Sequence, residues 1–244
     1  MLDIFLKDNG HFVNYGTEHF IAFTSCILLI AAVLYAGKRY WTTEQQYRYI
    51  IIITIIGAAS QLFKVLYKWN TGIFHAYEDY PLHLCNIMSL LMPFIYIFRM
   101  RILWGITFFW IMGGCAQSIF TPTLTESMPH YEATRYWLVH AVIILGALYG
   151  NIVSGWKITW KDAVRSILGL NLLAAIIYPI NVMLKANYMY LNAKPPGTTF
   201  YDLLGPWPEY MVALEFIVIT LFFAMTIPFY WRDIKAYLVE KKLL

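Results

Sequence analysis

Residues His19–Ala36 form the stretch HFIAFTSCILLIAAVLYA, which contains no lysine or arginine. The hydrocarbon core of a bilayer is about 30 Å thick, and a helix of about 20 apolar residues crosses it. The stretch therefore predicts a transmembrane helix. Acidic residues and Lys7 precede it without a small-residue cleavage site, which is not the pattern of a secretory signal peptide.

The composition extends this conclusion to the whole chain. Of the 244 residues, 60% are hydrophobic and only 13% are charged, whereas soluble domains carry about 25% charged residues. Such a composition excludes an ordinary cytoplasmic enzyme, a disordered protein and a nucleic-acid binder. Three cysteines are too few for a disulfide framework. We expect an all-α, polytopic membrane protein whose single integral membrane domain covers residues 1–244.

Seven stretches are apolar enough to predict membrane spans, which would form a seven-transmembrane-helix bundle. The longest loop between them, about 182–209, contains Lys194-Pro195 and Gly205-Pro206, and proline and glycine prevent a continuous helix there. The predicted spans are approximately 19–36, 48–66, 82–98, 102–120, 135–151, 164–181 and 210–229.

The distribution of lysine and arginine predicts the orientation of the bundle. Positive residues concentrate in loops on the inner side of a membrane. One side of the predicted bundle carries 12 of the 18 lysines and arginines. This bias places the N-terminus outside and the C-terminus inside. The 12 residues are Lys38, Arg39, Arg48, Arg99, Arg101, Lys157, Lys161, Arg165, Arg232, Lys235, Lys241 and Lys242.

Polar and ionisable residues collect near the outer ends of the predicted spans. Cys85, His140 and Glu215 each lie a few residues inside the membrane, and all six histidines fall on the outer side or in its loops. Polar groups are costly at membrane depth and usually face the bundle interior or a wet cavity. We therefore expect one polar pocket that opens toward the outer leaflet.

Cys85 is the strongest catalytic candidate. A thiolate is the best ordinary nucleophile among side chains, and a neighbouring base activates it. Its alternative role is that of a small buried hydrophobic residue, as most free cysteines are. Cys26 and Cys115 lie in apolar surroundings and are assigned that role, whereas Cys85 lies in a histidine-rich segment.

Two histidines are candidate bases. His140 lies at the depth of Cys85 on another span, and its alternative role is an interhelical hydrogen bond. His83 is two residues from Cys85, a spacing at which side chains on a regular helix point nearly opposite ways. His83 would reach the thiol only if Pro81 keeps the entry to the span non-helical. Otherwise it shares a helix face with Asn86.

Three further polar residues are assigned binding or orienting roles. Glu215 would orient a histidine or would instead pair with Lys64 or Arg135. Asn86 and Gln117 would donate hydrogen bonds to an oxyanion or would instead make packing hydrogen bonds.

The chain also resembles a known family from about the second span to the seventh. Segment Tyr80–Asn86, YPLHLCN, resembles the signature of the YwaF family of bacterial integral membrane proteins, which is similar to the eukaryotic transmembrane protein 164 family. His140 matches the histidine of that family's fifth span. The other segments that resemble the family are GGCAQ (113–117), Thr121-Pro122, NYMYL (187–191), Lys194-Pro195 and LGPWP (204–208).

The resemblance implies a seven-span fold in a cell membrane, here a bacterial plasma membrane, and a cysteine-dependent phospholipid acyltransferase. Cys85 would accept the acyl chain, His140 would be its base, and His83 would belong to the same motif. The expected partners are a membrane phospholipid, a lysophospholipid-like acceptor and the bilayer itself, with no nucleic acid, metal or cofactor. Either Lys185 or Lys194 would lie near a lipid phosphate.

Two other functions are compatible with the residues. Outer-side histidines with Glu215 would hold zinc in a metal-dependent lipid hydrolase. However, no His-x-x-x-His or His-Glu-x-x-His pair lies on one helical face. A non-catalytic small-molecule binder or transporter would use His140 and Glu215 to bind a ligand or to relay protons.

Overall fold

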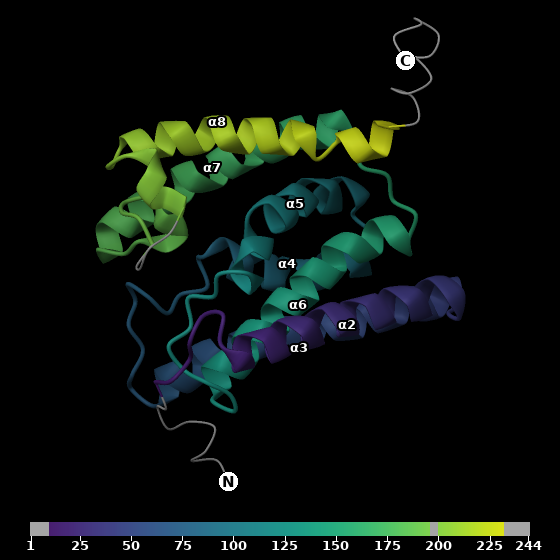
Figure 1. Cartoon of the computed structure of the whole chain (residues 1–244), viewed down its shortest axis with the longest axis horizontal. Coiled ribbons are helices and arrows are strands. Elements are labelled where there is room, and N and C mark those ends of the chain that lie inside the picture. The colour runs from purple at the N-terminus through teal and green to yellow at the C-terminus, as the bar shows by residue number, and fades with distance from the viewer. Residues whose placement is uncertain (1–9, 196–199, 232–244) are drawn as a thin grey trace, which may run out of the picture.

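The structure, a computed structural model, describes residues 10–195 and 200–231, and in these ranges the chain forms seven α-helices and no β-strand. The predicted all-α class is confirmed. The helices run back and forth along the long axis of the molecule (Figure 1). The α-helices are α2 (Thr17–Arg39), α3 (Thr43–Asn70), α4 (Leu84–Ile97), α5 (Arg101–Gly113), α6 (Tyr131–Ile152), α7 (Trp160–Leu184) and α8 (Glu209–Ala224), and the short 3-10 helices are η1 (Cys115–Ile119), η2 (Tyr188–Tyr190) and η3 (Phe200–Leu204).

Local side chains set the ends of the long helices. Thr42 begins α3 with a capping box, in which its hydroxyl accepts from the Gln45 amide and Gln45 Oε1 accepts from the Thr42 amide. At the start of α7, Asp162 accepts the Thr159 amide at 2.9 Å. Lys185 ends α7 with a left-handed backbone, φ 52°, a conformation common just after a helix.

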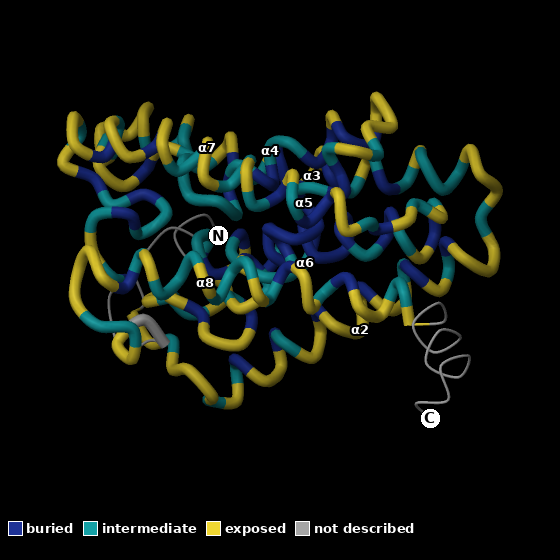
Figure 2. Tube along the Cα trace, turned by 90° about the horizontal axis from the view of Figure 1, so that it is seen from above, coloured by how far each residue is buried: buried dark blue, intermediate teal, exposed yellow. Residues whose placement is uncertain are grey.

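α6 is the central helix of the bundle. It packs against α2, α3, α4 and α5, and most of its residues are buried. α7 packs against α5 and α8 and forms a second layer with α8 (Figure 1). Figure 2 shows the buried residues concentrated in α4, α5 and α6, whereas α2, α7 and α8 carry exposed residues along their lengths. The outer helices therefore cover the central helices and form the exterior of the bundle.

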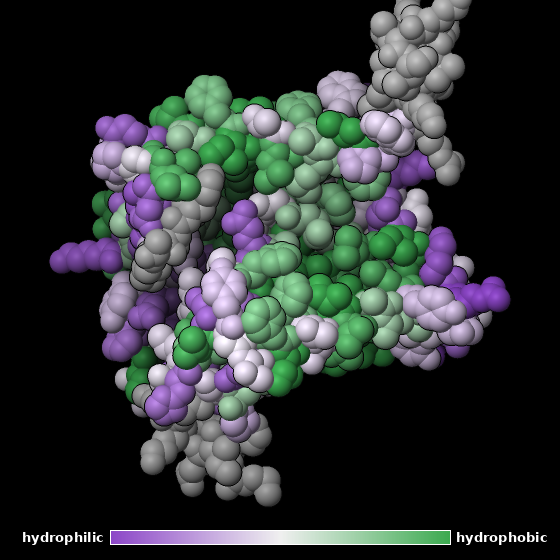
Figure 3. Space-filling model, viewed as in Figure 1, coloured by the Kyte–Doolittle hydropathy of each residue, from purple (hydrophilic) through white to green (hydrophobic). Residues whose placement is uncertain are grey.

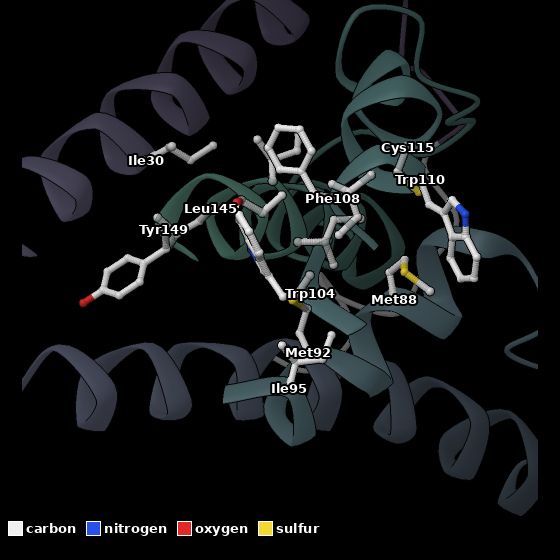
Figure 4. Packing of buried hydrophobic residues seen from close by; sticks show 14 of the residues in the cluster. Ile30, Met88, Met92, Ile95, Trp104, Phe108, Trp110, Cys115, Leu145 and Tyr149 are labelled. Atoms are coloured by element: carbon white, nitrogen blue, oxygen red, sulfur yellow. Dashed lines mark hydrogen bonds between the residues drawn. The ribbon is translucent and has the colours of Figure 1, made fainter. Parts of the chain in front are cut away.

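Large aromatic and sulfur-containing side chains fill the centre of the bundle (Figure 4). The Trp104 indole of α5 is fully buried and donates to the Ala147 carbonyl of α6 at 3.1 Å. A Cβ at Gly150 would lie 2.3 Å from this indole. Only glycine therefore permits α5 and α6 to approach this closely.

A buried ion pair fastens α5 to α7. Asp162 is fully buried and accepts from the Arg101 guanidinium at 2.8 and 2.7 Å. Arg165 lies 3.3 Å from the same carboxylate. Two guanidinium groups thus compensate the buried charge, and breaking such a pair would leave a charge without a partner.

The exterior of the bundle is that of a multi-pass membrane protein. In the part of the chain that the structure describes, five helical segments are long and apolar enough to cross a membrane: α2, α3, α5 with η1, α7, and α8 continued to Trp231. α4 is apolar but has 14 residues. α6 carries charged and polar residues in its first half, although most of its length is buried by its neighbours. Figure 3 shows hydrophobic residues over the middle of one face and hydrophilic residues toward its two ends.

Each of the seven predicted spans overlaps one α-helix, with two differences at the boundaries. The third predicted span begins at residue 82, whereas α4 begins at Leu84 because the backbone at His83 is extended, ψ 146°. The fourth predicted span, 102–120, is α-helical only to Gly113 and continues as η1. Some residues used for the orientation lie outside the described ranges: Lys7, Arg232, Lys235, Lys241 and Lys242.

Candidate functional site

Cys85 is the second residue of α4. His83 precedes the helix as its N-cap, so Cys85 lies in the first turn, where backbone amides have no intrahelical partner. The positive end of the helix dipole favours negative charge at this position. The Cys85 side chain is half-buried.

The Cys85 side chain packs against the hydrophobic core and has a few polar or charged groups in its neighbourhood. The charged groups of Arg135 and Lys64 lie within electrostatic range of the thiol. The Sγ atom donates to Asn86 Oδ1 at 3.8 Å. Cys115 of η1 also lies within electrostatic range of Cys85.

His140 is a buried imidazole with one nitrogen in use and one without a partner. Its side chain is 3% exposed, and Nδ1 lies 2.8 Å from the Tyr136 carbonyl oxygen. Because a carbonyl only accepts, Nδ1 carries the proton, and in the neutral ring Nε2 keeps a lone pair. Nε2 is buried without a hydrogen-bond partner. His140 therefore has the protonation pattern of a general base.

Tyr136 connects His140 to the Cys85 region. Its ring lies against the imidazole, with centroids 4.2 Å apart, and it is within electrostatic range of Cys85. Its hydroxyl donates to the Ser118 carbonyl at 2.9 Å, which ties α6 to η1. Among the described residues, no hydrogen bond joins Cys85 directly to His140. Catalytic hydrogen bonds are often long without substrate and form only in the complex.

His83 faces the outer loop. Its Nδ1 accepts from the Met189 amide at 3.3 Å. Its ring lies against Tyr188 and Tyr190, with centroid distances of 5.3 and 5.4 Å. The entry segment is non-helical, as a contact between His83 and the thiol requires, but the observed hydrogen bond of His83 fastens η2 to the start of α4.

A chain of hydrogen bonds links α6 to α3 near Cys85. Arg135 Nη2 lies 2.9 Å from Glu132 Oε2, and Arg135 Nη1 donates to Gln61 Oε1 at 2.6 Å. Gln61 is fully buried, and its Nε2 has no hydrogen-bond partner. This series of hydrogen bonds therefore ends at the Gln61 NH₂ group, which donates to no partner.

Asp79 fastens the loop before α4 to α3. It is 1% exposed, and its Oδ1 lies 2.7 Å from Lys68 Nζ and 3.5 Å from Lys64 Nζ. Its Oδ2 accepts from the His75 amide at 2.9 Å. Burial tends to raise the pKa of Asp79. The hydrogen bonds from Lys68 and His75, together with the lysine charges, outweigh burial and hold this pKa below its ordinary value.

We expect the Asp79→Asn variant to be less stable than the parent protein at pH 7. A carboxylate with a depressed folded pKa contributes stability above its ordinary pKa of about 3.9 and loses it as pH falls through the folded value. The expected loss is about 2 kcal/mol at pH 7, as for a hydrogen bond to a charged group. The difference should narrow below about pH 4. Thermal unfolding of both proteins in detergent, at pH 7 and below about pH 4, measures this difference in stability.

Glu44→Gln is the control for this experiment. The Glu44 side chain is 80% exposed and lies 2.7 Å from Arg48 at the opposite end of α3. Exposed ion pairs contribute little to stability, so its unfolding temperature should equal that of the parent. An Asp79→Asn variant that unfolds at the same temperature as the parent at pH 7 would contradict the proposed contribution of this carboxylate to stability.

Three of the remaining predicted residues lie near the outer end of the bundle in different surroundings. Asn86 is buried beside the Cys85 thiol. Gln117 lies in η1 with an exposed side chain. Lys194 lies 3.7 Å from Asp202 of η3, so its charge is paired within the outer loop.

Glu215 has a different hydrogen-bond partner from those expected. Its carboxylate accepts from Asn171 Nδ2 at 2.9 Å. No pairing with a histidine, Lys64 or Arg135 occurs among the described residues. The reason is that α8 packs against α7 and α5, whereas Lys64 and Arg135 lie on α3 and α6.

Gln61 and Asp79 are site residues that the sequence analysis missed. The signal for Gln61 lies in its spacing: Gln61, Lys64 and Lys68 recur about once per helical turn among mostly apolar residues. A polar stripe on a membrane helix faces the protein interior. No comparable periodicity marks Asp79, which lies in a loop.

The expected polar pocket stays a prediction. An open depression of about 490 Å³ lies on α2 and is lined by Thr17, Phe20, Ile21, Thr24 and Ser25. None of the predicted site residues lines it. Within residues 10–195 and 200–231, no group of three or more His, Cys, Asp or Glu side chains is arranged to hold a metal ion.

Comparisons with known proteins identify a family and a distant relative of this chain. A family model, that of the TMEM164 family, matches residues 14–226. An uncharacterized protein of Treponema pallidum (strain Nichols) is 23% identical over 232 residues, which cover 94% of this chain and 94% of that protein. No solved structure matches the chain. The matched range includes all seven helices and both Cys85 and His140.

Proposed function

Because the chain belongs to the TMEM164 family, we propose that it is a membrane-embedded acyltransferase. It moves a fatty acyl chain from a phospholipid to a lysophospholipid-like acceptor through an acyl-cysteine intermediate on Cys85. The observation that carries the proposal is the unpartnered Nε2 of His140, a buried base on the helix next to α4. A thiol at a helix start and a base with an unused lone pair are the groups that nucleophilic acyl transfer needs.

The proposed enzyme crosses the membrane seven times, with α2 to α8 as its spans. The bias of lysine and arginine supports an outer N-terminus and an inner C-terminus. Cys85 then lies just inside the outer leaflet, near the depth of the lipid ester carbonyls. The likeness to a protein of the bacterium Treponema pallidum supports a location in a bacterial plasma membrane.

The proposed reaction has two halves. His140 Nε2 takes the proton of the Cys85 thiol, and the thiolate attacks the ester carbonyl carbon of the donor lipid. A sulfur–carbon bond forms, the carbon–oxygen bond to the glycerol breaks, and His140 returns the proton to the departing oxygen. In the second half, His140 takes the proton of an acceptor hydroxyl. That oxygen attacks the thioester, and Cys85 leaves and recovers the proton.

Other residues have supporting roles in this proposal. His83 holds η2 against the start of α4 and so positions the first turn that contains Cys85. Asn86 orients the thiol through its side-chain oxygen. Gln117 and Lys194, near the outer end of the bundle, are proposed to contact the lipid headgroup, with Lys194 close to the phosphate.

Peptide mass spectrometry on protein purified from native lipids tests the proposal. We expect a hydroxylamine-labile acyl group on Cys85, which added lysophospholipid removes as the acylated acceptor appears. Acyl groups on Cys26 or Cys115 would indicate non-specific modification. An unmodified Cys85 that stays unmodified with fresh phospholipid would overturn the acyltransferase proposal and favour a non-catalytic binder.

A further inference from the structure

Gln61 carries a buried amide whose donor is unused. Its side chain is 0% exposed, and its Nε2 has no hydrogen-bond partner. An amide N–H buried without a partner costs free energy. Such a group therefore marks a place where an acceptor from a ligand belongs.

Arg135 fixes the orientation of the Gln61 amide. A guanidinium donates and never accepts, so the atom that faces it must be the Gln61 oxygen, 2.6 Å from Arg135 Nη1. Arg135 is held in turn by Glu132, whose Oε2 lies 3.0 Å from Nε and 2.9 Å from Nη2. The Gln61 NH₂ group is thus turned away from Arg135 before any substrate binds.

Gln61 and Cys85 lie at the same depth on neighbouring antiparallel helices. α3 packs against α4, and a Cβ on Gly57 would lie 3.6 Å from Ser89 Oγ, so Gly57 and Ser89 face each other. Gln61 follows Gly57 by four residues on α3. Cys85 precedes Ser89 by four residues on α4. Each step is about one turn toward the outer end on the same helix face. Gln61 therefore lies level with the first turn of α4, on the face of α3 that packs against α4.

Arg135 independently places this amide in the catalytic region. Arg135 is hydrogen-bonded to Gln61, and it lies within electrostatic range of both Cys85 and His140. Arg135 is thus bonded to the amide side chain and electrostatically coupled to the nucleophile and to the base. Oxyanion sites need this arrangement, in which a fixed donor stands beside the nucleophile in a site that excludes water.

We infer that Gln61 Nε2–H is the oxyanion donor for the carbonyl of a lipid carboxylic ester and of the acyl-Cys85 thioester. The inference rests on the proposed function. When the Cys85 sulfur bonds to the carbonyl carbon, the π electron pair moves to oxygen, and Gln61 donates a hydrogen bond to that oxygen. When the intermediate collapses, the pair re-forms the carbonyl and the bond to the leaving oxygen breaks. His140 protonates that oxygen, and Gln61 exchanges no proton.

The Gln61→Glu variant tests the inference. A carboxylate still accepts from Arg135, so a purely structural role is preserved, but the donor is lost. We expect the single-turnover rate of Cys85 acylation by phospholipid to fall about 10²- to 10³-fold, as when one oxyanion donor is removed. The unfolding temperature should stay equal to or above that of the parent. The control is Gln45→Glu, the same change near the other end of α3, where the accepting role of Gln45 is kept.

The outcomes separate the two proposals. A folded Gln61→Glu protein that acylates Cys85 within a few-fold of the parent rate overturns the role of Gln61 and leaves the acyltransferase intact. A parent protein whose Cys85 is never acylated overturns both. If Gln61→Glu does not fold, Gln61→Met, of similar volume and without a donor, gives the same comparison. A folded Gln61→Met protein with the parent rate likewise overturns the inference.

Discussion

Replacing Cys85 by alanine is expected to reduce acyl transfer to the assay background, a loss of about 10⁴-fold or more, as when the nucleophile of a covalent mechanism is removed. The thioester cannot form without the sulfur, so neither half of the reaction proceeds. The measurement is acyl exchange between a labelled phospholipid and a lysophospholipid in detergent or vesicles. Only the Cys85 adduct should disappear from the peptide spectrum.

Cys115→Ala is the matched control for Cys85→Ala. Cys115 is buried in η1 within electrostatic range of Cys85, but it lies in the hydrophobic core. Its truncation removes a similar volume close to the same site, so we expect transfer to be retained with a modest loss of stability. Transfer that survives in Cys85→Ala and disappears in Cys115→Ala would assign the nucleophile to η1 instead.

His140→Asn is expected to slow Cys85 acylation by about 10²- to 10⁴-fold at neutral pH, the usual contribution of a general base. The asparagine amide reaches the position of Nδ1 and preserves the donation to the Tyr136 carbonyl. The variant therefore removes the base while it keeps the structural hydrogen bond. Single-turnover acylation followed by mass spectrometry measures the rate.

The pH dependence of His140→Asn distinguishes a lost base from a distorted site. Without a base, the thiolate forms only by ionisation to solvent, so the variant rate should rise about tenfold per pH unit below the thiol pKa. His75→Asn, an exposed histidine of the outer loop, is the control and should retain the parent rate. Acylation of His140→Asn at the parent rate at neutral pH would show that the base lies elsewhere.

Much of the helical arrangement follows from residues close together in the chain. The lysine-free stretch 19–36 predicts the helix that the structure places at Thr17–Arg39, and each other predicted span overlaps a helix. Such segments are predictable because a membrane selects for length and hydropathy within one contiguous segment. The prediction that Cys85 and His140 lie at one depth rests on counting residues along each helix, a local quantity as well.

Tertiary packing decides which side chains meet. Glu215 hydrogen-bonds Asn171, His83 fastens η2, and Gln61 completes the chain from Arg135. Depth along a helix does not distinguish these partners, because the rotation of each helix and its choice of neighbours depend on contacts between distant segments. The close approaches at Gly57 and Gly150 are such contacts. Interhelical packing at these glycines sets which polar faces point inward, and thereby places Gln61 level with the first turn of α4.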